Sequence, residues 1–415
     1  MDGLKSTRSP GLVLRDARLI GQANLVDLAV MNGVFIALEA SSGLPELDLQ
    51  GRLVIPGFVD AHMHLDKAYA LESGLVPGDS LSAAIQNFYR WREEISPLQV
   101  YHNARRAAEQ AVLNGTLALR THTTVDGPVG LGWLESLLKV KEELSCQVTV
   151  QIVAFPDSNE LVMGRAEKLL REALAAGADA LGGAPLMCSS PQQATDLLFE
   201  IAGEAGCDLD LHIDESDDPN AKTLEYLAER KIALGFPHRV VAGHCTSLSA
   251  MTEVEACRVI EKVARAGLFI VTLPSCNLYL MGRNDRGLIR RGLTRVNELL
   301  AAGISVSFAS DNVRDAFNPF GSADMLQQAL ICAHALHMGS SLELELLLQM
   351  GTRFPADALG IGDISLKVGN PASFVVLDST DWADALARIV PGRHVFRRGV
   401  LVAETIVENR LGVSN

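Results

Sequence analysis

Residues 54–70 of the chain read VIPGFVDAHMHLDKAYA. An apolar run leads into His62 and His64, which are separated by one residue, and Lys67 follows them. Side chains two residues apart in a strand point to the same face, so both imidazoles can share one ion. Two such histidines can equally be core residues held by hydrogen bonds. The rest of the chain has to distinguish these two interpretations.

Eight short apolar runs alternate with longer amphipathic segments from residue 54 onward. Several of the amphipathic segments end in Gly, as helices often do. The apolar runs are LVIPGFVDAHMH, TLALRTHTTV, QVTVQIVAFP, ADALGGAP, LDLHIDE, RVVAGHC, LFIVTLPSCN and ISVSFASDN. Strands with near-continuous apolar cores that alternate with helices are typical of a parallel sheet. The pattern therefore predicts an α/β protein with a (β/α)8 TIM-like barrel at residues 56–365.

The two ends of the chain differ from the middle and resemble each other. Residues 1–55 and residues 366–415 contain short strands that alternate polar and apolar residues and break at Gly. We therefore expect both ends to form one small β-sandwich domain, with the barrel inserted between its halves.

Composition excludes several classes of protein. The net charge is −14 and no basic cluster stands out, which argues against a nucleic-acid partner. No apolar stretch reaches the roughly 20 residues of a membrane span, and the first residues lack the apolar segment of a signal peptide. The seven cysteines are odd in number and show no C-x-x-C spacing, so neither a disulfide framework nor a thiolate zinc site is indicated. We expect a cytoplasmic protein.

Polar side chains gather at the ends of the predicted strands, where barrel enzymes carry their chemistry. Asp157 ends the third strand, Glu215 follows the fifth, and Asp311 ends the eighth. Five of the ten histidines also lie at strand ends: His62, His64, His122, His212 and His244. Three neutral imidazoles and one carboxylate suit Zn²⁺ or Fe²⁺ with a position left for water. We expect such a site from His62, His64, His212 and Asp311.

Four motifs together resemble the amidohydrolase superfamily: GFVDAHMHLDK, LDLHIDE, AGHC and SFASDNVRDAFNPFG. Within it, the chain is similar to the branch of cytosine deaminases and N-isopropylammelide amidohydrolases, over nearly its whole length. The resemblance implies metal ligands at His62, His64, His212 and Asp311, a catalytic acid at Glu215 and a catalytic histidine at His244. Binuclear members carry a carboxylated Lys on the fourth strand. That strand has none here, so the resemblance implies one divalent metal per subunit.

The activity that the resemblance implies is hydrolytic deamination. Water attacks a ring carbon that bears an amino or alkylamino group. Asp311 takes a proton from that water, and His244 holds and polarises the water. Glu215 protonates the neighbouring ring nitrogen, and the products are an oxo ring and ammonia or an amine. Two alternatives stay open: a cyclic amide hydrolase like the dihydroorotases and hydantoinases, or a non-catalytic metal-binding homologue. Family members are commonly oligomers, so a homo-oligomer is expected.

The predicted substrate contacts depart from the cytosine deaminases. Asp157 stands where those enzymes have Gln, and Asn312 where they have a second Asp. A carboxylate only accepts hydrogen bonds, so the ring edge that faces Asp157 must donate them or carry positive charge. Lys67 and Asn312 are similar to the N-isopropylammelide enzymes. We therefore expect a pyrimidine-like or triazine-like substrate other than plain cytosine. His122 and Phe317 are further candidates for substrate contact, with core packing as the alternative for both.

Overall fold

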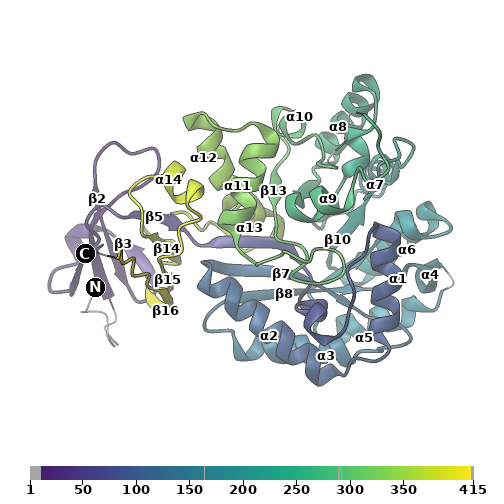
Figure 1. The fold of residues 1–415 in the computed structure, drawn as a ribbon, viewed down its shortest axis with the longest axis horizontal. Coiled ribbons are helices and arrows are strands. Elements are labelled where there is room, and N and C mark those ends of the chain that lie inside the picture. The colour runs from purple at the N-terminus through teal and green to yellow at the C-terminus, as the bar shows by residue number, and fades with distance from the viewer. Residues whose placement is uncertain (1–10, 163, 288–289, 291, 413–415) are drawn as a thin grey trace.

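The computed structural model describes residues 11–162, 164–287, 290 and 292–412. A barrel forms the larger part, and a small β domain lies at one side of it (Figure 1). Eight parallel strands follow one another in chain order around the barrel sheet. They are β6 (Phe58–Met63), β7 (Thr116–Thr124), β8 (Thr149–Phe155), β9 (Ala180–Gly183), β10 (Asp208–Ile213), β11 (Val240–His244), β12 (Phe269–Thr272) and β13 (Val306–Phe308). The predicted (β/α)8 barrel is confirmed, and each of the eight strands overlaps its predicted run.

The barrel closes where β6 meets the segment after β13. Met63 forms a parallel bridge with Asp311. The Asp311 amide donates to the His62 carbonyl at 2.9 Å, and the His64 amide donates to the Asp311 carbonyl at 3.3 Å. This seam brings residues from opposite ends of the barrel sequence side by side.

Helices cover the outside of the barrel. Helix α8, for example, begins at a capping box of Thr252 and Glu255 and ends at Gly267, whose φ is 61°. None of the described helices is long and apolar enough to cross a bilayer. The helices are α1 (Leu81–Arg92), α2 (Pro97–Leu113), α3 (Gly132–Glu143), α4 (Ser158–Val162), α5 (Ala166–Ala176), α6 (Pro191–Ala205), α7 (Thr223–Leu234), α8 (Glu253–Ala266), α9 (Pro274–Leu280), α10 (Val296–Ala301), α11 (Met325–Leu336), α12 (Ser341–Met350), α13 (Arg353–Leu359) and α14 (Trp382–Ala387).

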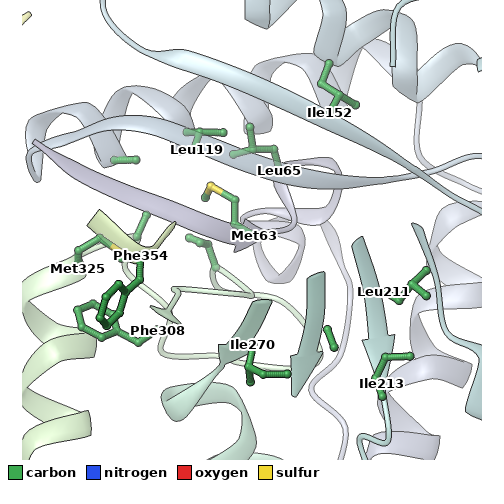
Figure 2. Close-up of a cluster of buried hydrophobic side chains, with 14 of the residues drawn as sticks. Met63, Leu65, Leu119, Ile152, Leu211, Ile213, Ile270, Phe308, Met325 and Phe354 are labelled. Atoms are coloured by element: carbon green, nitrogen blue, oxygen red, sulfur yellow. The ribbon is translucent and has the colours of Figure 1, made fainter. Parts of the chain in front are cut away.

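Apolar side chains of the strands and of the covering helices form one continuous core (Figure 2). On β10, Leu211 and Ile213 are fully buried in this core. Because side chains alternate along a strand, Asp210 and His212 point to the opposite face, toward the barrel interior. The same alternation that builds the core therefore presents the polar side chains to the site.

The two ends of the chain form two four-stranded sheets, with the orders β3-β2-β1-β4 and β16-β15-β14-β5. Phe35 of one sheet and Phe374 of the other lie 5.8 Å apart between ring centroids, in a shared apolar cluster. The strands are β1 (Gly11–Ala17), β2 (Val26–Met31), β3 (Val34–Ile36), β4 (Glu46–Asp48), β5 (Leu53–Pro56), β14 (Phe374–Leu377), β15 (Arg393–Arg397) and β16 (Val400–Thr405). The small β domain expected from both termini is confirmed, with one parallel pair, β1 with β4. Residues 1–10 and 413–415 of that prediction lie outside the described residues, and its boundaries stay a prediction.

Candidate active site

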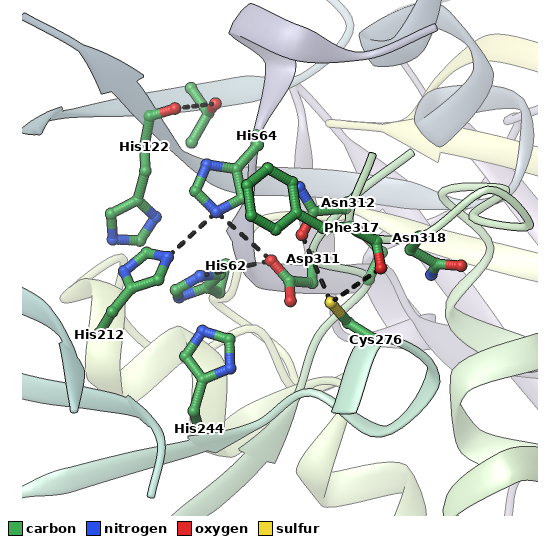
Figure 3. Close-up of polar contacts among 12 residues, drawn as sticks. His62, His64, His122, His212, His244, Cys276, Asp311, Asn312, Phe317 and Asn318 are labelled. Atoms are coloured by element: carbon green, nitrogen blue, oxygen red, sulfur yellow. Dashed lines mark hydrogen bonds and ion pairs between the residues drawn. The ribbon is translucent and has the colours of Figure 1, made fainter. Parts of the chain in front are cut away.

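Five histidines meet at the carboxyl ends of the barrel strands (Figure 3). His62 and His64 come from the end of β6, His122 from β7, His212 from β10 and His244 from β11. The Nε2 atoms of His64 and His212 are 3.1 Å apart. The rings of His62 and His122 have their centroids 4.1 Å apart. All five strand-end histidines named from the sequence thus share one site.

Asp311 joins the same cluster from the seam of the barrel. Its Oδ1 lies 3.4 Å from His64 Nε2 and 3.7 Å from His62 Nε2. The four predicted metal ligands are therefore brought together. The imidazoles also form two overlapping groups of three, whose nitrogens lie within 4.8 Å of one another: His62 with His212 and His244, and His62 with His64 and His122. Which four atoms bind a metal stays a prediction.

The donor atoms of this cluster fit a divalent cation. Both ring nitrogens of His62 and both carboxylate oxygens of Asp311 are buried and make no hydrogen bond within the described residues. Buried polar atoms without partners are unfavourable unless a ligand satisfies them. The pKa values of His62, His64 and His212 are lowered well below the ordinary value of histidine. Burial is the largest cause, and repulsion from neighbouring cationic groups adds to it. The imidazoles are therefore neutral, which is the form that binds metals.

Three strand ends at the site have a left-handed backbone. The φ angles are 47° at Asp214, 68° at His244 and 59° at Asp311. Such angles are uncommon for residues other than Gly and persist only where the surrounding structure holds them. The Asp214 carboxylate accepts hydrogen bonds from the first two backbone N–H groups of α7 at 3.0 and 2.9 Å. Asp214 therefore holds the turn that presents the next residue, Glu215.

Glu215 and His244 are joined by a side chain that was not predicted. Glu215 Oε1 lies 3.2 Å from His244 Nδ1. The Nδ2 of Asn277 on α9 lies 3.2 Å from the same oxygen and 3.1 Å from the same nitrogen. Asn277 follows the seventh strand, but Asn is so common in turns that its position alone does not indicate a function.

His122 supports the cluster from behind. It is fully buried, its Nε2 lies 3.3 Å from Asp210 Oδ1, and Arg120 donates to Asp210 Oδ2 at 2.9 Å. Asp210 Oδ1 also lies 4.0 Å from His62 Nδ1. His122 is not among the residues that line the site cavity. The geometry thus disfavours the substrate contact expected at His122 and favours a role in orienting His62.

A cavity of about 250 Å³ opens onto three of the histidines, His64, His212 and His244. Lys67, Asp157, Asn312 and Phe317 all line it, as expected for substrate contacts. Helix α1 forms one wall, which the sequence did not predict. Asn312 is held in place by two contacts. Its Nδ2 donates to Asp315 Oδ2 at 2.6 Å, and its Oδ1 accepts from the Cys276 thiol at 3.5 Å.

Lys67 is a buried cation within this cavity. It is 7% exposed, and its Nζ lies 4.8 Å from the ring centroid of Phe88 and 5.1 Å from that of Phe317. Aromatic faces attract such a cation. No hydrogen bond or ion pair to Lys67 is found within the described residues.

Asp157 is paired with Arg92, the last residue of α1. Arg92 Nη2 lies 3.2 Å from Asp157 Oδ2. The sequence could not indicate this pair, because Arg92 lies in a helix between β6 and α2 and not at a strand end. The guanidinium also contacts Asp126 and offsets part of the charge of both carboxylates, so a hydrogen-bond donor on the ring edge is enough to face Asp157.

The chain matches one protein family and is similar to several known proteins over most of its length. A model of the amidohydrolase family matches residues 46–136 and 123–411. The chain is 32% identical over 391 residues to the pterin deaminase of Rhizobium rhizogenes strain K84, covering 92% of this chain and 89% of that protein. It is 31% identical over 410 residues to the N-isopropylammelide isopropyl amidohydrolase of Pseudomonas sp. strain ADP, covering 94% and 98%. The crystal structure of 5-methylcytosine deaminase from Klebsiella pneumoniae with 5-fluorocytosine has a TM-score of 0.87 at 30% identity, covering 96% and 99%.

Proposed function

The chain belongs to the amidohydrolase family, and we propose that it is a metal-dependent deaminase that replaces an amino or alkylamino group on a nitrogen heterocycle by oxo. The observation that carries this proposal is the pair of Glu215 and His244, held 3.2 Å apart and lining the same cavity as Asp311. The relatives are named for pterin, N-isopropylammelide and 5-methylcytosine, which are all nitrogen heterocycles with an exocyclic amine. The reaction is hydrolysis of a C–N bond other than a peptide bond.

One divalent ion, Zn²⁺ or Fe²⁺, would be held by His62, His64, His212 and Asp311. When bound, such an ion lowers the pKa of a water from 15.7 to about 7. A single ion is supported by β9, whose residues Ala180–Gly183 include no lysine.

The protein groups move the protons of the reaction. Burial and the charge of Asp311 raise the pKa of Glu215 well above its ordinary value, so Glu215 carries a proton that it can give to a ring nitrogen. Asp311 accepts the proton of the attacking water, and His244 holds that water by its neutral imidazole. Protonation of the ring makes the attacked carbon electrophilic. The proton held by Asp311 then leaves with the amine, and the new hydroxyl group on the ring carbon returns its proton to Glu215 as the oxo product forms.

The cavity walls select the ring. The ammonium of Lys67 has only donors, so it binds an acceptor such as a ring oxo group and disfavours an amino group there. Phe88 and Phe317 hold that ammonium and present flat apolar faces. Asp157 accepts a hydrogen bond from a ring N–H, and the amide of Asn312 orients the ring at the base of the pocket. The substrate class is therefore a neutral, planar amino-oxo heterocycle.

A screen for released ammonia and alkylamines tests this function. Zinc-loaded and iron-loaded protein is incubated with aminated pyrimidines, purines, pterins and triazines, and with hydantoin and dihydropyrimidines as ring-opening controls. We expect amine release, equal to the oxo product formed, from at least one class. Ring opening without amine release, or no turnover by metal-loaded protein, would contradict the proposal. A cytoplasmic location and a homo-oligomeric state remain predictions, which cell fractionation and light scattering can test.

A further inference from the structure

Arg92 joins two carboxylates that follow neighbouring barrel strands. Its Nη1 contacts Asp126, which follows β7, and its Nη2 lies 3.2 Å from Asp157 Oδ2, after β8. The exposed fractions of Arg92, Asp126 and Asp157 are 8%, 0% and 8%, and all three line the cavity. Tyr89 covers the guanidinium, with its ring centroid 4.1 Å from Cζ, and its hydroxyl hydrogen-bonds Asp157. The group is a built polar site and not a surface ion pair.

One donor of this guanidinium is left over. The Nε of Arg92 is buried and has no hydrogen-bond partner among the described residues. The N–H groups of a guanidinium form a rigid planar fork. An acceptor bound at Nε therefore lies in the plane of the guanidinium, whose Nη2 contacts Asp157. The pair presents a donor and an acceptor side by side.

The position of Arg92 separates this pair from the Lys67 end of the cavity. Phe88, which contacts Lys67, and Arg92 are four residues apart in α1, so they lie on the same helix face. Four residues of an α-helix correspond to a rise of about 6 Å. The cavity wall thus carries two cationic side chains, Lys67 beside Phe88 and Arg92 one helical turn further along α1.

On the basis of the proposed function, we infer that Arg92 is a specificity-determining residue that binds a ring amide together with Asp157. The ring carbonyl accepts from Arg92 Nε, and the adjacent ring N–H donates to Asp157. A heterocycle without this amide leaves both groups without a ligand partner. A site built to hydrogen-bond a polar group rejects analogues that lack it far more strongly than an apolar pocket can.

Two matched pairs of compounds test the inference: cytosine with 4-aminopyrimidine, and pterin with 2-aminopteridine. The second compound of each pair keeps the amine but lacks the ring amide. We expect wild-type kcat/KM to favour the amide-containing compound by about 100-fold or more. In Arg92→Gln this ratio falls below about 10, mainly through KM, and Arg92→Lys recovers part of it. Arg90→Gln is the control, because Arg90 is an exposed arginine of the same helix. Its ratio stays at the wild-type value.

Loss of Arg92 leaves the buried carboxylate of Asp126 without its cation, which can destabilise the fold. The double variant Arg92→Gln/Asp126→Asn, which removes that charge too, is therefore measured as well. Circular dichroism checks the folding of each variant. Calorimetric binding of the same four compounds to the metal-loaded protein gives a readout without turnover. Binding that loses its preference in the Arg92 variants, with no turnover of any compound, supports the subsite and contradicts the deaminase proposal. An unchanged preference in the folded variants, or a wild type that binds neither compound of either pair, overturns the inference.

Discussion

Glu215 Oε1 and His244 Nδ1 lie 3.2 Å apart, although the two residues follow different barrel strands. Asn277 contacts both of these atoms through its Nδ2. Burial and the charge of Asp311 raise the pKa of Glu215 well above its ordinary value, whereas burial lowers that of His244 to about 3. At neutral pH the carboxyl group is therefore the member of the pair that holds the proton, and the imidazole is neutral.

Glu215→Gln removes that proton carrier while keeping the shape of the side chain. We expect kcat to fall by about 10²–10⁴-fold, as for loss of a general acid, with bound metal unchanged by elemental analysis. Glu261→Gln, an exposed carboxylate on α8, serves as the control and keeps wild-type turnover. A Glu215→Gln variant with near-normal kcat would remove Glu215 from the catalytic role.

Asn277→Ala removes the donor that orients both partners. A displaced acid lowers the rate even when it is still present, because small misplacements of reacting groups cost up to about 100-fold. We expect kcat to fall by about 10-fold or more with little change in KM. Asn220→Ala, in an exposed loop, is the matched control. If Asn277→Ala changes KM and leaves kcat intact, Asn277 contacts substrate and does not position Glu215.

Strand-end residues could be predicted from the sequence because the signal is local. Alternation within each apolar run indicates which side chains face inward, and the run ends at the carboxyl edge of the sheet. This reasoning found His62, His212 and Asp311, whereas Lys67 was proposed from the family resemblance. The seam between β6 and β13 then joins them, as the barrel topology requires.

Contacts made by segments between the strands could not be predicted in this way. Arg92 reaches Asp157 from an inserted helix, and no periodic pattern relates residues 65 positions apart. The alternation also did not reveal that His122 is fully buried against Asp210 and does not line the cavity. Both features depend on tertiary contacts and not on the order of residues along one strand.

Lys67→Met removes a buried ammonium that has no ion pair within the described chain, and keeps an apolar stem between Phe88 and Phe317. Because an unpaired buried charge is unfavourable, we expect the thermal unfolding temperature to stay the same or rise. KM for amino-oxo substrates should rise by about 10-fold or more. Lys168→Met, whose side chain is 85% exposed, is the control for loss of charge. Loss of stability without a change in KM would indicate a structural role for Lys67.

His212→Ala removes a predicted metal ligand from β10. We expect bound metal to fall from about one equivalent to below about 0.1, measured by elemental analysis after dialysis. Because a ligand that binds only the folded state stabilises it, metal should raise the unfolding temperature of the wild type but not of the variant. His334→Ala, on an exposed part of α11, should retain wild-type metal content. Full metal content in His212→Ala would favour a site made by His62, His64 and His122.

Gly321→Ala tests whether the loop after Asp311 depends on close backbone contact. A Cβ at position 321 would lie 1.9 Å from the Asn312 carbonyl oxygen, and backbone cannot rotate away as a flexible side chain can. We expect a loss of unfolding free energy of about 1–3 kcal/mol, the usual range for overpacking, together with a higher KM because Asn312 lines the cavity. At Gly339 a Cβ would meet nothing within 4 Å. Gly339→Ala should therefore unfold at the wild-type temperature, and equal stability of the two variants would show that the loop adjusts without strain.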